Sequence, residues 1–371
     1  MRPLLAQGSL ALNIEIVRPQ DLTPEDIARW ADLQALDLSF ENPFLSPYWA
    51  QAVERAQSPG KYGFKVAILR EGGRAVGFLP ARTGALTALP VGAPFCDYQA
   101  VVCEPGLDFD PVEIIRALGV HRFDFTSLLA SQEPMARFGK DATETRLVDL
   151  PNGYAAYEAE QKSRGAKIFK RLGTSRRNAE RNFGPLRFTA MSPSVEILDQ
   201  LIAMKSGQLK ETGKSDIFGP QWSNSMVHDL FRSEIPDFGA CLFTLHVGDE
   251  LAAIHLHLRN RRVLSGWLIT HFEKFQSFSP GVILFQEILR WMETVGLTRL
   301  DLGAGDYQFK RAFANATQGV VSGSIGVPSP VTWMREAAYG AATIAEALPL
   351  GRFSHYPARA RRRLDVIRSL H

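Results

Sequence analysis

Residues 288–302 read ILRWMETVGLTRLDL, and this stretch decides the fold. Its apolar spacing predicts the end of a helix, Gly296 the residue that closes that helix, and the last six letters a short strand. Residues 114–125, IIRALGVHRFDF, have the same form around Gly119. The sequence therefore predicts two copies of a helix–glycine–strand unit.

A second pair of landmarks supports this duplication. Residues 66–79, VAILREGGRAVGFL, predict a strand, a tight turn and a strand, and residues 242–256, LFTLHVGDELAAIHL, repeat the pattern. The turn glycines Gly72 and Gly248 lie 176 residues apart, and the two glycines that close the helices lie 177 apart. Because both spacings agree to one residue, we predict a duplicated α/β unit. The alternative is that a hairpin followed by a helix is simply common in α/β proteins.

Length and composition limit the class of protein. A chain of 371 residues suggests about two domains, and a hydrophobic content of 45% with net charge +3 excludes a disordered or acidic-tail protein. The three cysteines have neither a disulfide pattern nor metal-ligand spacing, so we predict no metal and a reducing compartment. The N-terminus lacks signal-peptide features, and the apolar residues 331–350 carry charges that oppose a membrane span. We expect a cytoplasmic protein that can contact the inner membrane from its surface.

The chain divides into three predicted parts. Residues 1–150 form a first unit, and the turn-rich sequence LPNG then leads into residues 151–328, the second unit. Residues 329–371 form a basic helical segment. Two predicted helices, residues 154–183 and 194–211, follow the join and have no equivalent in the first half; the earlier one is a basic insertion.

A phosphate site is predicted at residues 276–281, QSFSPG, which precede a helix over residues 282–294. Ser279 is a suitable N-cap, Pro280 suits the first helical turn, and Gly281 allows a ligand to approach the backbone. The free N–H groups and the dipole of a helix N-terminus attract phosphate. The first half has three acids at this point, so only the second half is expected to bind phosphate. An ordinary capped helix is the alternative.

The sequence DLGAGDYQFKR, residues 301–311, predicts a strand end, a glycine-rich turn and a short helix. Asp306, Tyr307 and Lys310 can share one helix face, with Arg311 beside them. An acid, a phenol and a cation in one turn could orient a nucleophile and offset oxyanion charge. The alternative is a surface salt bridge.

His255 and His257 alternate on one face of a predicted strand, and His271 ends the next strand. A neutral imidazole there could take a proton from an attacking amine near pH 7. A hydrogen-bonded structural role is the alternative for each histidine.

Two basic stretches remain. One spans residues 162–181 and includes Arg176 and Arg177; the other lies near the C-terminus and includes Arg359 and Arg363. Such stretches attract nucleotides, other polyanions or anionic lipid headgroups, or are solvated helix faces. The near-neutral total charge argues against a protein that binds a nucleic acid duplex.

The sequence resembles the CelD/BcsL acetyltransferases over most of its length. These are GNAT-superfamily proteins of bacterial envelope and exopolysaccharide loci, related to FemAB-like peptidoglycan transferases. The residues that carry the resemblance are SPG at 279–281, DLGAGDYQFK at 301–310 with its Gly-Asp-x-x-x-Lys signature, NPFLSPYW at 42–49, and the basic segment around Arg176 and Arg177.

The resemblance implies an α/β (α+β) fold of tandem GNAT-like acyltransferase units, each a mixed twisted sheet flanked by helices, the second unit catalytic. It implies no bound cofactor and acyl-CoA, either acetyl-CoA or long-chain acyl-CoA, as cosubstrate. Gln276, Ser279, Gly281 and Arg311 are the expected donor-binding residues, with serine at the first glycine position of the family's phosphate loop.

From motif position and reach, we expect direct attack of a substrate amine on the thioester carbonyl. His257 or His255 would be the base, Tyr307 would protonate the leaving thiolate, Lys310 would stabilise charge or hold a phosphate, and Asp306 would orient Lys310 or the amine.

The expected acceptor is an amino sugar of an envelope polysaccharide or exopolysaccharide, or its lipid-linked precursor, with Arg176, Arg177, Arg359 and Arg363 as anion-binding residues. One alternative is a ceramide-synthase-like transfer of a long acyl chain to a lipid amine. The other is a regulator of polysaccharide export that binds cyclic di-GMP through Arg359 and Arg363.

Overall fold

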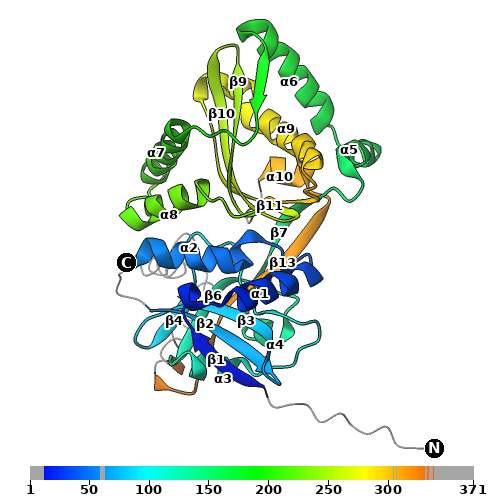
Figure 1. The fold of residues 1–371 in the computed structure, drawn as a ribbon. Helices are drawn as coiled ribbons and strands as arrows, with labels where there is room; N and C mark the ends of the chain where they lie inside the picture. The colour runs from blue at the N-terminus through cyan, green and yellow to red at the C-terminus, as the bar shows by residue number, and fades with distance from the viewer. Residues whose placement is uncertain are drawn as a thin grey trace, which may run out of the picture.

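The computed structural model describes residues 12–58, 63–303, 305, 307–330, 332, 333 and 337. Within these segments thirteen strands form one sheet in the order β1-β2-β3-β4-β6-β13-β7-β12-β11-β10-β9-β8, with β5 paired to β3 (Figure 1). The strands are β1 Asn13–Val17, β2 Gly63–Glu71, β3 Arg74–Thr83, β4 Thr87–Pro90, β5 Val102–Cys103, β6 Arg122–Leu129, β7 Gly139–Asp149, β8 Leu186–Thr189, β9 Gly239–Val247, β10 Glu250–Asn260, β11 Val263–His271, β12 Arg299–Asp301 and β13 Ala316–Gly326.

The helices connect and cover this sheet. They are α1 Pro24–Leu36, α2 Pro47–Gln57, α3 Pro111–Ala117, α4 Glu133–Ala136, α5 Gly153–Ser163, α6 Ile168–Phe183, α7 Val195–Glu211, α8 Gln221–Phe231, α9 Pro280–Thr294 and α10 Gln308–Phe313, with 3-10 turns η1 Pro19–Asp21, η2 Pro43–Leu45 and η3 Glu273–Phe278. None of the helices in the described segments is both long enough and apolar enough to cross a membrane.

The two halves of the chain repeat one topology. In each half an antiparallel hairpin, β2–β3 or β9–β10, is followed by a strand, a helix and a strand parallel to the one before the helix. Gly72 and Gly248 turn the hairpins with φ of 58° and 60°, and Gly119 and Gly296 follow helices α3 and α9 with φ of 75° and 74°. The predicted duplication and the fold of tandem GNAT-like units with mixed sheets are therefore confirmed.

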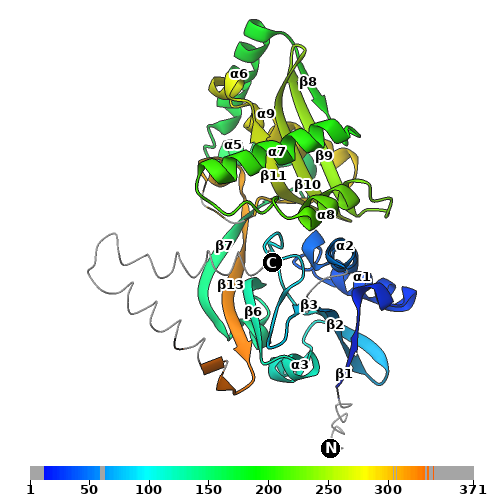
Figure 2. The same cartoon turned by 90° about the vertical axis from the view of Figure 1, so that its left-hand side faces the viewer.

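The last strands of the two halves are exchanged. Strand β13 closes the second half of the chain but pairs with β6 of the first, whereas β7 closes the first half but pairs with β12 of the second. The two strands start 177 residues apart and pair with each other in the centre of the sheet. Figures 1 and 2 show them crossing together between the halves. The division at residue 150 remains a prediction about where one unit ends and the next begins along the chain, because strands from the two sides of residue 150 pair with each other.

One sequence expectation about the helices was wrong. Helices α7 and α8 lie between β8 and β9 as α1 and α2 lie between β1 and β2, so the predicted helix over residues 194–211 has a counterpart in the first half. The predicted helix over residues 154–183 divides into α5 and α6, because the chain adopts a left-handed φ of 85° at Gly165.

Aromatic side chains join the two halves into one core. Trp267 of β11 contacts Phe44, Trp49 and Phe95 of the first half, with ring centroids 6.4, 6.0 and 6.1 Å away. Trp222 of α8 contacts Phe95 at 5.6 Å. Rings of this size bury large apolar areas, so the position of each half depends on the other.

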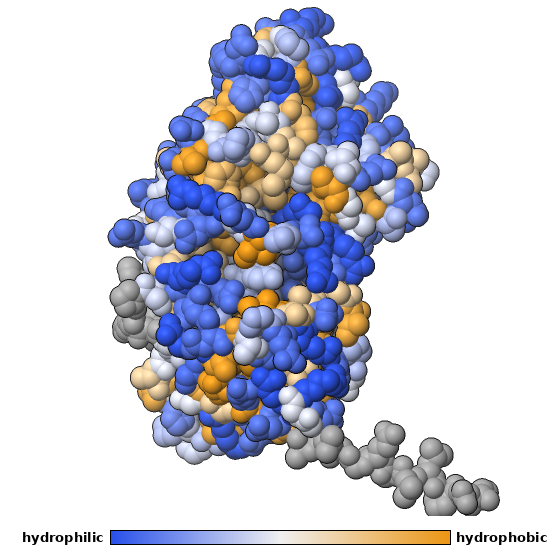
Figure 3. Space-filling view, viewed as in Figure 1, coloured by the Kyte–Doolittle hydropathy of each residue, from blue (hydrophilic) through white to orange (hydrophobic). Residues whose placement is uncertain are grey.

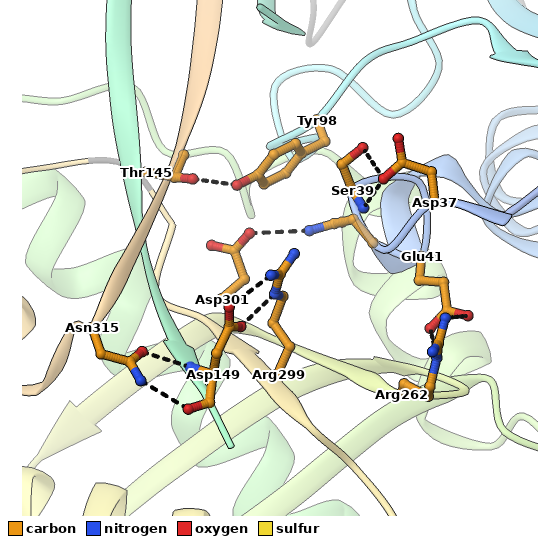
Figure 4. Close-up of polar contacts among 11 residues, drawn as sticks. Asp37, Ser39, Glu41, Tyr98, Thr145, Asp149, Arg262, Arg299, Asp301 and Asn315 are labelled. Carbon is orange, nitrogen blue, oxygen red and sulfur yellow. Dashed lines mark hydrogen bonds and ion pairs between the residues drawn. The ribbon is translucent and has the colours of Figure 1, made fainter. Parts of the chain in front are cut away.

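An ion pair with a buried carboxylate adds to this join. Arg262, in the β10–β11 turn, donates to both carboxylate oxygens of Glu41 at 2.8 and 2.9 Å (Figure 4). Asn260 donates to the Glu41 carbonyl oxygen at 3.1 Å. Since the Glu41 side chain is 1% exposed, this turn of the second half is anchored to the loop before η2.

Candidate functional site

Strands β11 and β12 run parallel and pair only over residues 263–265 and 299–301. Strand β11 continues to His271 while β12 ends at Asp301, so the two strands separate there. Two glycines lie where they separate: a Cβ on Gly266 would lie 3.2 Å from the Asp301 carbonyl oxygen, and one on Gly303 would lie 4.0 Å from the Gly266 carbonyl oxygen. We call this place the fork.

Helix α9 begins beside the end of β11. Its N-cap, Ser279, adopts a left-handed conformation with φ of 53°, and its hydroxyl does not cap the helix, contrary to the sequence expectation. The Ser279 carbonyl instead accepts from the amides of Val282 and Ile283 at 3.0 and 3.1 Å. Ser279 and Gln276 are exposed and Gly281 is half-buried. The positive end of a 15-residue helix therefore faces outward with small side chains, as an anion site requires.

The corresponding helix of the first half is closed to an anion. The Asp110 side chain accepts a 2.9 Å hydrogen bond from the amide of Val112 and caps α3. A carboxylate already occupies the positive end of that helix and would oppose an anion there.

The histidines of β10 lie beneath the start of α9. The Nε2 atom of His255 would lie 3.5 Å from a Cβ on Gly281, and His271 lies on the far side of the same glycine. His257 packs against Gly266 and Phe243, and neither of its ring nitrogens has a hydrogen-bond partner. Burial lowers the pKa of His255 well below 6.5 and lowers the pKa of His257 to about 3. Both imidazoles are therefore neutral at pH 7.

Lys310 lies on the other side of the fork from the histidines. It is buried, and its ammonium donates to the Gly303 carbonyl oxygen at 3.3 Å. Burial lowers the pKa of Lys310, while Asp97 and Asp301 act to raise it. A Cβ on Gly303 would lie 3.6 Å from Asp97 Oδ2 and 3.9 Å from Lys310 Nζ, so both charged groups border the same glycine.

Two buried carboxyl groups accompany this lysine. Burial, together with Asp301, raises the pKa of Asp97 to about 7, and Lys310 opposes the shift. Burial also raises the pKa of Asp301, whose oxygens accept from the Gly303 amide at 2.6 Å and the Asn42 side chain at 3.2 Å (Figure 4). Asp97 and Asn42 belong to the first half, so both halves build this part of the site.

The remaining predicted residues are distributed around the fork and away from it. Tyr307 is 60% exposed, and its ring lies 5.4 Å from Lys310 Nζ. Arg311 is exposed on α10. Arg176 forms an ion pair with Glu287 of α9, and Arg177 points to Thr174 on its own helix. Asp306, Arg359 and Arg363 lie outside the described residues.

The sequence reasoning missed Asp97, Tyr98 and Asn42, and it assigned no role to Asp301. One signal was present: Asp97 is an acid within an otherwise uncharged stretch, residues 91–103. No group of His, Cys, Asp or Glu within the described segments is arranged to hold a metal ion.

The family comparison decides what kind of domain surrounds the fork. Residues 166–311 match the family model described as an acetyltransferase (GNAT) domain. This part of the chain is similar to GNAT acetyltransferase domains. It extends from α6 into α10 and includes the histidines, the start of α9 and Lys310. The chain is accordingly an N-acyltransferase, and acyl-CoA is the cosubstrate that GNAT domains use.

Several solved structures align with both halves of the chain. FemX aligns with a TM-score of 0.54 at 10% identity over 87% of this chain and 100% of its own. A tandem GNAT protein from the clavulanic acid biosynthesis pathway has a TM-score of 0.45 at 14% identity, with 86% and 100% covered. The C-terminal domain of a protein described as a lysylphosphatidylglycerol synthetase, from Agrobacterium fabrum, has a TM-score of 0.47 at 15% identity, with 84% and 96% covered. No curated protein matches the chain.

Proposed function

We propose that this protein transfers an acyl group from acyl-CoA to the amine of an amino sugar in an envelope polysaccharide or exopolysaccharide, or in its lipid-linked precursor. The observation that carries the proposal is the meeting of three features at the fork: the start of α9, the buried Lys310, and Asp97 of the first half. The resemblance to the CelD/BcsL acetyltransferases supports the choice of acceptor.

The proposed donor site follows β11 toward α9. The pyrophosphate of CoA would lie against the exposed start of α9, where Gln276, Ser279 and Gly281 leave the backbone accessible. The residues present fit such a group, because no acidic side chain caps this helix. The thioester of the bound acyl-CoA would then lie toward the fork.

Asp97 is the proposed base, in place of the histidines. A base works best when its pKa lies near the operating pH, and the pKa of Asp97 is about 7 whereas that of His257 is about 3. The Asp97 carboxylate would take a proton from the substrate ammonium, and the free amine would attack the thioester carbonyl. The buried ammonium of Lys310 would stabilise the tetrahedral oxyanion.

The proposed reaction ends with cleavage of the carbon–sulfur bond. An amide forms as the thiolate leaves: Tyr307, whose exposed ring borders Lys310, gives its proton to sulfur, and the Tyr307 phenolate takes the proton that the attacking nitrogen loses. Each His imidazole remains neutral under this scheme, so His255 would help to shape the donor site next to Gly281.

Calorimetric titration with acetyl-CoA, palmitoyl-CoA and CoA tests the donor. We expect binding of at least one thioester, lost in Gly281→Glu and kept in Gly281→Gln, which has nearly the same size without the charge. Gly281 does not have a positive φ, and its nearest side-chain neighbour would lie 3.5 Å from a new Cβ, so both variants should fold. If none of the three ligands binds, the acyl-CoA proposal is wrong.

A further inference from the structure

A small cavity lies between the two halves, on the side of β12 that faces the first half. Its walls include Ser39, Asn42 and Tyr98 from the first half, Arg299 and Asp301 from β12, and Gln318 from β13. The cavity volume is about 10 Å³, which is room for one water-sized group. Figure 4 shows Asp301 and Tyr98 pointing toward this space from opposite sides.

We propose that this cavity receives the ammonium group of the acceptor, with Asp301 as its counter-charge. The inference rests on the proposed function and names the part of the site that recognises the acceptor. The remainder of the acceptor would lie outside the cavity, since its volume admits the amine alone.

The first argument is the charge of the cavity. The guanidinium of Arg299 lies in its wall but is already bound by both oxygens of Asp149, at 2.6 and 2.7 Å. Asp97 and Asp301 carry two carboxyl groups against the one ammonium of Lys310. A cation entering the cavity would favour the ionised form of these carboxyl groups, and an anion would oppose it.

The second argument is the supply of hydrogen-bond acceptors. An ionised carboxylate can accept about four hydrogen bonds, and Asp301 has three donors around it, the Asn42 side chain, the Gly303 amide and the Tyr98 hydroxyl, so at least one acceptor position remains. Ser265 pairs with Asp301 across β11 and β12, on the same strand face as the cavity-lining Val263. The Ser265 hydroxyl is buried and has no partner. An ammonium has three N–H donors, which these oxygens can satisfy.

The third argument is the position of the cavity relative to the fork. Asp301 lines the cavity and binds the Gly303 amide, and the Gly303 carbonyl accepts from Lys310. Tyr98 lines the cavity while its neighbour Asp97 borders Lys310. The cavity therefore adjoins the residues that border the fork, where the proposed base Asp97 lies.

Thermal unfolding with methylammonium chloride tests this assignment. We expect a saturable rise in Tm that is absent in Asp301→Asn, absent with the bulkier tetramethylammonium chloride, and absent with potassium chloride at equal ionic strength. The matched control is Asp108→Asn, an exposed carboxyl of the first half, which should keep the rise. An equal rise with all three salts, or an unchanged rise in Asp301→Asn, would show that the cavity holds only water.

A second variant keeps the test decisive if Asp301→Asn fails to fold. Ser39 lies in a loop at the cavity wall and is only half-buried, so Ser39→Leu should fold and block the cavity. We expect it to abolish the methylammonium response and to raise the KM for glucosamine at least tenfold, with the Kd of acetyl-CoA unchanged. If wild type binds methylammonium but no acyl-CoA, the donor proposal is wrong and the cavity assignment stands.

Discussion

Asp97 illustrates the limit of sequence reasoning at the level of single residues. Lys310 could be predicted because its motif places it four residues after Asp306 and next to two glycines. Asp97 lies more than 200 residues away and reaches Lys310 only because the two halves pack together. No residue spacing in the sequence indicates such a contact. The carboxyl partner of Lys310 could therefore be identified only from the structure.

The carboxyl of Asp97 makes both activity and stability depend on pH. Wild-type kcat/KM should fall as pH drops through about 7, because Asp97 becomes protonated. In Asp97→Asn we expect a loss of 10²–10⁴-fold and no such titration. Rate–pH profiles measure this, with Asp108→Asn as the control. A profile in Asp97→Asn equal to wild type would remove Asp97 from the reaction.

The free energy of unfolding should change with pH in the opposite direction to kcat/KM. The folded state binds a proton at Asp97 with pKa about 7, against an ordinary value of 3.8, so this stabilisation is complete below pH 4 and is lost as pH rises through 7. At pH 8, Asp97→Asn should raise the free energy of unfolding by at most about 4 kcal/mol, at roughly 1.4 kcal/mol per pKa unit. Urea unfolding at pH 5 and pH 8 measures the difference. An Asn variant less stable at pH 8 than wild type would contradict it.

Gly92 lies in the loop that carries Asp97 and adopts a backbone conformation that favours glycine. Its φ is 81°, and a Cβ there would approach Trp49 Cε2 to 2.8 Å. We expect Gly92→Ala to lower the free energy of unfolding by about 2–5 kcal/mol, from the left-handed backbone and the overlap combined. The control is Gly106→Ala, which has a similar φ of 77° but nothing within 4 Å, and should cost only about 1–2 kcal/mol. Urea unfolding measures both variants. If they lose the same free energy of unfolding, the overlap between the new Cβ and Trp49 is relieved without cost.

At the level of elements, helices were predicted best where a pattern alone determines them. The positive end of α9 was expected from SPG, and it is exposed. The role of Ser279 was not predictable in the same way, because its left-handed backbone turns the hydroxyl away from the amides it would cap. The basic helix predicted around Arg176 is also present as α6, although Arg176 itself is half-buried and forms an ion pair with Glu287.

Helix α6 and its N-cap present a stripe of five exposed cations on the face opposite the buried residues. They are Lys167, Lys170, Arg171, Arg177 and Arg181, and their spacings of three, four and seven residues keep them on one face. Figure 3 shows hydrophilic side chains over the end of the molecule where α6 lies. A stripe of this kind attracts anionic lipid, at about 1 kcal/mol per basic residue.

We expect the protein to bind vesicles containing phosphatidylglycerol and not vesicles of phosphatidylcholine. Reversal of three stripe charges, Lys170→Glu, Arg171→Glu and Arg177→Glu, should weaken that binding at least about 100-fold. Co-sedimentation measures it. Lys162→Glu with Arg164→Glu on α5 is the control, because those two cations are paired with Glu158 and Glu160. Equal weakening by both sets would reject the stripe as the contact.

At the level of the whole molecule, duplication was predictable and strand exchange was not. The matching glycines fix how far apart the two copies lie in sequence. They do not fix which half β7 and β13 join, because either pairing would use the same alternating residues. Only the sheet shows that each half is completed by a strand from the other.

The exchange predicts that neither half folds alone. Fragments 12–150 and 151–337, expressed separately, should show little cooperative unfolding, because each would present an unpaired edge strand in place of its partner. Mixed together, they should recover a single thermal transition and acetyl-CoA binding. Calorimetry of the separate and mixed fragments measures this. A cooperative transition in an isolated fragment would show that the exchanged strand is dispensable.

The exchange of β7 and β13 also limits how the two halves of the enzyme can move relative to each other during the reaction cycle. Two separate domains can rotate apart about a hinge when a substrate binds or leaves. Here the same rotation would have to break the hydrogen bonds between β7 and β13, which pair along their length. Entry and release must therefore depend on loops and short helices around the fork, and these include the loop that carries Asp97 and helix α10 that carries Lys310.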